Sequence, residues 1–201
     1  MHLVPHTITC NAAVSSCEKA RRWEAALRLA RAMARDGPWP DLVTLNALVS
    51  ACEKSLEWNL AVRLLREAQR GWQPDVFTYS AAVSACEKRR RWEQSVTLLH
   101  SMCSAGLNPN VVTYDAAIAS CAAELRAWHC ALELLGELRH KELRPNEVTH
   151  GSALGAFAAG QAWEQALALP PATSRAAAAR GMLLTACAES RSWRRAAALL
   201  G

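Results

Sequence analysis

Side chains that can contact a nucleotide recur along this chain at intervals of about 35 residues. A short polar side chain, able to hydrogen bond to the edge of a base, recurs as Asn11, Asn46, Ser80 and Asp115. Three residues before each stands an apolar side chain, which can pack on the face of a base. Eight residues after the first three stands a cation that can neutralise a phosphate: Lys19, Lys54 and Lys88.

These residues recur because the sequence repeats itself. The string T-L-N-A-L-V-S-A-C-E-K at Thr44–Lys54 is echoed at Thr9–Lys19 and Thr78–Lys88, with looser copies from Thr113 and Thr149. Successive copies start 35, 34, 35 and 36 residues apart. This spacing predicts four repeats, a degenerate fifth and a partial sixth, at 7–41, 42–75, 76–110, 111–146, 147–176 and 177–201, with 1–6 as the tail of a preceding repeat.

Each repeat is predicted to form two helices, and positions are counted below from the first residue of a repeat. Threonine at position 3 is the expected N-cap of the first helix. Glycine and proline close each repeat. A tryptophan is expected to begin each second helix and to pack in the core: Trp23, Trp58, Trp92, Trp128, Trp163 and Trp193. A hairpin of this size buries its apolar face by stacking, so the predicted fold is all-α, an α-solenoid.

A helical wheel separates two faces of the first helix. Positions 4, 7, 8 and 11 form the expected buried face, which in the third repeat consists of Tyr79, Ala82, Val83 and Cys86. Positions 2, 5, 9 and 13 lie on another face, which there consists of Phe77, Ser80, Ser84 and Lys88. Stacking would align these second faces into a strip suited to single-stranded RNA. A solvated polar face without a ligand fits the helical geometry equally well.

The amino-acid composition excludes several classes of protein. Of the 201 residues, 51% are hydrophobic and 20% charged, which excludes a disordered chain, and the net charge of +5 permits an anionic partner without requiring one. No apolar run is long enough to predict a membrane span. The eight cysteines include no C-x-x-C pair and are expected to be free buried thiols. No cofactor, metal site or catalytic constellation is expected. His140-Lys141-Glu142 matches the H-x-E motif of zinc deaminases, but the P-C-x-x-C motif that they require is absent from the sequence. His129-Cys130 could begin a metal site, but no second pair of ligands lies at a suitable spacing in the sequence.

The repeat length, the T-Y-[N/S/D] start, the two-helix unit and the closing Pro-Asp or Pro-Asn resemble pentatricopeptide repeats of the P type. The resemblance covers nearly the whole chain and is strong in the first four repeats (L-V-T-L-N, V-F-T-Y-S, V-V-T-Y-D). The alanine-rich S-A-A-V-S-A-C-E-K string is similar to that of some algal members. The tetratricopeptide pattern W-x2-L-G-x2-Y is absent.

The resemblance implies a monomeric, non-membrane protein that binds single-stranded RNA at about one nucleotide per repeat, running 5′ to 3′ from the N-terminus. It implies a role in RNA processing, stabilisation or translation in an organelle, the chloroplast ahead of the mitochondrion, with other RNA-processing proteins as further candidate partners. It implies that the fifth and last residues of a repeat select the base together. The pairs are Asn11 with Asp41 and Asn46 with Asp75, which favour U, Ser80 with Asn110, which favours A, and Asp115 with Asn146, which has no assigned base.

The resemblance also implies roles for two further positions. Position 2 would wedge between bases, in the order Ile8, Val43, Phe77, Val112 and Val148. Position 13 would contact phosphate through Lys19, Lys54 and Lys88, whereas Ala123, Ala159 and Glu189 stand there in the later repeats. Gly151 at the fifth place of repeat 5 offers no side chain to a base. Because the chain begins and ends within a repeat, we expect a fragment of a longer array. A scaffold that holds a peptide in the same groove is the alternative function, and an enzyme is not expected.

Overall fold

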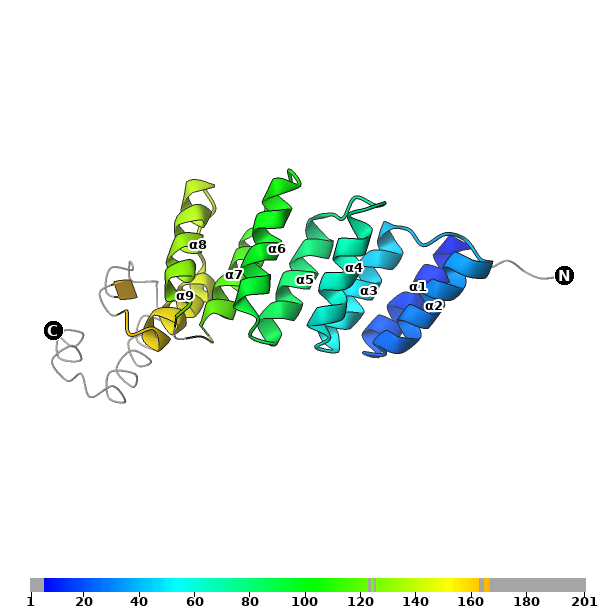
Figure 1. The fold of residues 1–201 in the computed structure, drawn as a ribbon, viewed down its shortest axis with the longest axis horizontal. Helices are drawn as coiled ribbons and strands as arrows, with labels where there is room; N and C mark the ends of the chain where they lie inside the picture. Colours follow the sequence, from blue (N-terminus) through cyan, green and yellow to red (C-terminus); the bar gives the residue numbers. More distant parts are fainter. Residues whose placement is uncertain (1–5, 123, 125, 163–164, 167–201) are drawn as a thin grey trace. The chain divides into compact units, whose positions relative to one another are not determined.

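The computed structural model describes residues 6–122, 124, 126–162 and 165–166 (Figure 1). All regular secondary structure in these residues is α-helical. The helices are α1 (Thr7–Lys19), α2 (Trp23–Asp36), α3 (Leu42–Lys54), α4 (Trp58–Ala68), α5 (Val76–Lys88), α6 (Trp92–Ser104), α7 (Val111–Cys121), α8 (Trp128–His140) and α9 (Glu147–Ala159). The partial sixth repeat with Trp193 and Glu189, the end of the fifth repeat, and residues Trp163 and Ala123 lie outside the described residues.

The helix bounds follow the predicted repeats. The helices α1, α3, α5, α7 and α9 begin at the first residue of successive repeats. The second helices begin at the recurring tryptophan, as predicted, with α2 at Trp23, α4 at Trp58, α6 at Trp92 and α8 at Trp128. These four rings are half-buried rather than enclosed. Trp128 is also stacked on the ring of His129, with the ring centres 3.4 Å apart.

The prediction that threonine at position 3 is the N-cap is wrong. The N-cap of α3 is Asp41, whose carboxylate accepts a hydrogen bond from the backbone N–H of Thr44, two residues after the helix has begun. Asp75, Asn110 and Asn146 cap α5, α7 and α9 in the same way. Both residue types are good caps, and the residue that closes the preceding repeat takes the role because its side chain reaches the free N–H groups of the first turn.

The described helices divide into two units, each a stack of helical hairpins. In the first, Met1–Arg89 with Thr97–Asn108, α1 packs against α2 and α3, and α3 packs against α4 and α5. A core between the first two repeats is built by Val14, Ala26, Met33, Leu48 and neighbouring alanines. In the second unit, Arg90–Val96 with Pro109–Gly201, α7, α8 and α9 pack against one another. Stacked helical repeats of this kind define the α-solenoid class, as predicted.

The predicted buried face of the first helices is confirmed. Tyr79, Ala82, Val83 and Cys86 are all buried, and the corresponding residues of α3 are buried as well. Cys52, Cys86 and Cys121 occupy the same position in successive repeats, and burial raises the pKa of each of these free thiols to about 12. The other four described cysteines are free and half-buried. None of the described helices has the length and apolar character needed to cross a membrane.

Candidate nucleic-acid interface

The fifth and last residues of a repeat, called here a reader pair, contact one another. The Nδ2 amide of Asn11 lies 3.0 and 3.2 Å from the two carboxylate oxygens of Asp41, although 30 residues separate them. In the second repeat the Nδ2 amide of Asn46 donates a hydrogen bond of 3.2 Å to Asp75. Each contact joins the first helix of one repeat to the N-cap of the next, so helix packing brings the two side chains together.

The reader pair of the fourth repeat forms the same hydrogen-bonded connection, but the carboxylate and the amide have exchanged places. Asp115 supplies the carboxylate and Asn146 the amide, and the hydrogen bond from Nδ2 of Asn146 to Oδ2 of Asp115 measures 2.9 Å. Asp115 is buried, whereas Asn11 and Asn46 are half-buried. The remaining predicted pair falls on both units: Ser80 is half-buried on α5, and Asn110 caps α7.

A buried threonine fixes each of these three reader pairs. The hydroxyls of Thr44, Thr78 and Thr149 donate to the fifth residue of the preceding repeat, respectively Asn11, Asn46 and Asp115. The same hydroxyls accept a hydrogen bond from the N-cap backbone N–H, which completes a capping box. The fifth residue is therefore held by both members of the cap rather than free to rotate.

The two aspartate caps are stabilised in their ionised form. Burial opposes ionisation of Asp41, but hydrogen bonds from the backbone and hydroxyl of Thr44 and from Asn11 outweigh it, so its pKa is lowered. The pKa of Asp75 is lowered in the same way, against burial, by Thr78 and Asn46. Both reader pairs therefore present a carboxylate acceptor beside an amide, and a base with a donor and an acceptor on its edge can match them.

The apolar residues at position 2 are exposed on the same helices. Exposed apolar side chains that recur on one surface can mark a binding site, and these are open to a planar ligand. The exposed fractions are 82% for Ile8, 56% for Val43, 55% for Phe77, 68% for Val112 and 59% for Val148.

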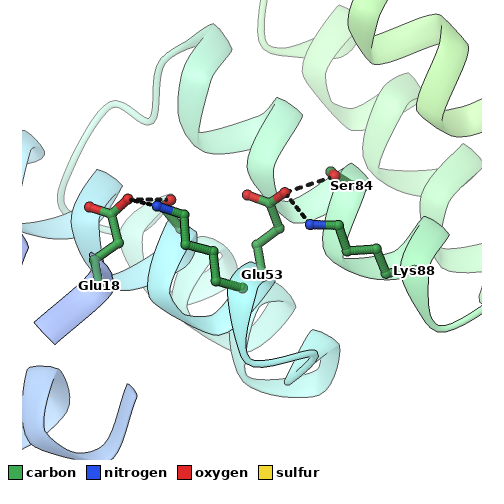
Figure 2. A network of polar contacts seen from close by, with 6 residues as sticks. Glu18, Glu53, Ser84 and Lys88 are labelled. Carbon is green, nitrogen blue, oxygen red and sulfur yellow. Dashed lines mark hydrogen bonds and ion pairs between the residues drawn. The ribbon is translucent and has the colours of Figure 1, made fainter. Parts of the chain in front are cut away.

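Two of the lysines at position 13, Lys54 and Lys88, form ion pairs with glutamates. Nζ of Lys54 lies 2.6 Å from Oε1 of Glu18, and the hydroxyl of Ser50 donates to that same oxygen at 2.8 Å. One repeat later, Oε1 of Glu53 accepts from Lys88 at 2.8 Å and from Ser84 at 2.9 Å. Figure 2 shows the two arrangements side by side. Each glutamate, with the serine and lysine of the next repeat, is called here a glutamate clasp.

The clasp is replaced by small residues at the α7–α9 junction. Ala122 occupies the position of the glutamate and Gly155 that of the serine, and a Cβ on Gly155 would lie 3.5 Å from Cβ of Ala122. The same two positions therefore face each other, but these residues lack the side-chain hydrogen bond that joins serine to glutamate in the two clasps. Lys19, at the start of the series, has no ion pair among the described residues.

Sequence reasoning missed the threonines and the glutamates. It treated Thr44 and Thr78 as helix caps, and it placed no role on Glu18 or Glu53. The signal for the glutamates was present, because Glu and Lys recur together in C-E-K at the end of the first three first helices. No group of three potential metal ligands gathers among the residues that the structure places.

The chain matches known repeat families over more than half its length. It matches the PPR repeat over residues 8–38 and 43–71, and the PPR repeat family over residues 74–123. No curated protein matches this chain.

Solved structures share its fold. The pentatricopeptide repeat protein PPR10 from maize superposes with a TM-score of 0.76 at 21% identity, over 99% of this chain and 29% of that one. PPR10 in complex with an 18-nt psaJ RNA element gives 0.72 at 23% identity, over 96% and 29%. The PPR domain of Arabidopsis thaliana protein-only RNase P 1, in complex with tRNA, gives 0.69 at 16% identity, over 80% and 85%. The chain thus spans less than a third of PPR10. Its repeats, helices and family matches agree: the chain belongs to the pentatricopeptide repeat family.

Proposed function

We propose that this chain binds single-stranded RNA, with about one nucleotide facing each repeat and without catalysing a reaction. The observation that carries the proposal is the reader pair, because three pairs form the same hydrogen-bonded connection between successive repeats. An exposed apolar side chain precedes the fifth residue of each by three positions. A base packed on that side chain would present its edge to the pair.

The family resemblance supplies a direction for the proposed RNA and, applied to the reader pairs, a partial sequence. By family resemblance the first two repeats select U and the third selects A, reading 5′ to 3′ from the N-terminus. An oligonucleotide containing U-U-A-N, with N facing the fourth repeat, is therefore the preferred ligand. The repeats of PPR10 and of the RNase P domain were solved with RNA, which supports RNA as the partner. We further propose that the target is an organellar transcript, which the protein stabilises, processes with other factors, or prepares for translation.

Fluorescence anisotropy with the full chain tests this function. A labelled U-U-A-containing single strand is titrated at several salt concentrations, beside the same sequence in a duplex. We expect single-strand binding that weakens as salt rises, because the backbone contacts are electrostatic, and little duplex binding. A chain that binds neither RNA at low salt is not an RNA-binding module, and the exposed apolar row would then favour a peptide-binding scaffold.

A further inference from the structure

The two glutamate clasps place a carboxylate beside the lysines that are proposed to meet the RNA backbone (Figure 2). The Lys54 side chain is 37% exposed, and Glu18 beneath it is 18% exposed. The Lys88 and Glu53 side chains repeat these values at 37% and 20%. The ammonium groups therefore lie on the solvent side of each pair, and the carboxylates lie deeper between the repeats.

Each lysine can contact a phosphate without leaving its glutamate. An ammonium group has three N–H donors, and one of them is used in the clasp. A phosphate that accepts from another donor still experiences the nearby carboxylate, so the pair attracts it far less than an isolated lysine does. Because the charge of the lysine is already balanced, its contact with phosphate releases little of the counterion that an unpaired lysine releases.

We propose that Glu18 and Glu53 limit the affinity of this face for the RNA backbone by neutralising Lys54 and Lys88. The inference rests on the proposed function and adds to it a pair of acidic residues that tune binding strength without touching a base. The serines position each glutamate clasp, because Ser50 and Ser84 hold the carboxylates at a fixed place between repeats through hydrogen bonds. Affinity is thereby kept moderate, so that the reader pairs contribute a larger share of the binding free energy, because contacts to the RNA backbone carry no sequence information.

Replacing one acid by its amide tests the inference. Glu53→Gln keeps an oxygen that can accept from Ser84 but removes the charge beside Lys88. We expect about 2- to 5-fold tighter binding of the U-U-A single strand at low salt, the range of a partly exposed ion pair. The plot of log affinity against log salt should steepen by about 0.7, the value for one further phosphate neutralised on a single strand. In the double variant E18Q/E53Q the two gains in affinity should multiply, and the two changes in slope should add.

A matched control separates the clasp from net charge. Glu67 pairs with Arg63 at 3.0 Å on the outer part of α4, and both side chains are more than half exposed. Glu67→Gln changes the charge of the chain by the same amount and also frees one cation. We expect a change of about 1.5-fold or less, because Arg63 lies on α4, a second helix, rather than at position 13 of a first helix, and exposed ion pairs contribute little. Adding Lys88→Gln to Glu53→Gln should abolish the gain, because the released cation is then absent.

The outcomes separate this inference from the proposed function. Wild-type binding with no tightening or steepening in Glu53→Gln, or with an equal change in Glu67→Gln, overturns the inference and leaves RNA binding intact. Failure of both the wild type and E18Q/E53Q to bind removes the function and the inference together. Binding by E18Q/E53Q alone supports both. Thermal unfolding of each variant shows whether the fold has been kept.

Discussion

The hydroxyl of Thr78 donates a hydrogen bond to Oδ1 of Asn46, across 32 residues of sequence and from one repeat to the next. The same hydroxyl accepts from the backbone N–H of Asp75, the other member of the reader pair. Thr78 is fully buried, so it cannot itself contact a ligand. Its place is that of a positioning residue, which fixes the amide of Asn46 in one orientation.

Thr78→Val should therefore weaken base selection at the second nucleotide. Valine has the shape of threonine but leaves the Asn46 oxygen and the Asp75 N–H without their buried partner, at a cost of about 1–3 kcal/mol in the free energy of unfolding. Thr78→Ser keeps the hydroxyl and should retain the preference for U. Urea unfolding and titration with the four bases at that nucleotide measure both effects. Retention of full U selectivity in Thr78→Val would show that the hydroxyl only caps the helix.

Ser95→Ala should stabilise the protein. The Ser95 side chain is fully buried, and its hydroxyl has no hydrogen-bond partner among the residues that the structure describes. Buried alanines, Ala26 and Ala61, occupy this place in the first two repeats. Removal of an unsatisfied hydroxyl should gain about 1 kcal/mol in the free energy of unfolding. Ser120→Ala is the control, because Ser120 is buried with its hydroxyl donating to the carbonyl of Ala117, and that change should not stabilise.

Gly160→Ala should destabilise the second unit. A Cβ at Gly160 would overlap Cδ1 of Trp128 and lie 2.9 Å from its Cβ, so the tryptophan that begins α8 would have to move. Overpacking of this kind costs about 1–3 kcal/mol. In Gly136→Ala, within α8, the new Cβ would meet no atom of another described segment within 4 Å, and the change should gain up to about 1 kcal/mol from helix propensity. Thermal melts that rank the two variants in the opposite order would contradict the packing of Trp128 on Gly160.

The stability contributed by the aspartate caps should be constant from pH 5 to 8. The pKa values of Asp41 and Asp75 are lowered in the folded chain, so their contribution is present above the unfolded pKa of about 3.9 and is lost as the pH falls through the folded pKa. Urea unfolding between pH 2 and 8 should show this loss as an acid limb, a fall in the free energy of unfolding at low pH. Asp75→Asn keeps a capping side chain without a titrating group, and its acid limb should be shallower. An unchanged acid limb in that variant would assign the pH dependence to other groups.

Much of the fold could be predicted because the same pattern of core and boundary residues recurs in successive repeats. The tryptophan and the closing proline mark the helix boundaries in each repeat, and the wheel positions of Tyr79 and Val83 identify the buried face. The cap was misassigned because Asp41 and Thr44 are both capping residues three positions apart, and sequence alone does not say which lies outside the helix. The period thus located the repeats and the tryptophans located the second helices, whereas the start of each first helix required the backbone.

The site could be predicted only in part. Family resemblance paired Asn46 with Asp75, but the contact joins residues 29 apart, which no periodicity argument derives. The glutamate clasps were missed because position 12 lies on the wheel between the buried face and position 5 of the polar strip, and an isolated helix does not show which residue of the next repeat it meets. Only the packing of α3 against α5 brings Glu53 to Lys88.

Exchange of one reader pair tests the central claim most directly. The double variant N46S/D75N gives the second repeat the Ser and Asn of the third, and binding is measured with each base at the second nucleotide while the first stays U. We predict that the preference there changes from U to A, by about 1–3 kcal/mol in relative affinity, while the first nucleotide keeps its preference for U. An unchanged preference for U at the second nucleotide, with binding intact, would contradict recognition of bases by these pairs.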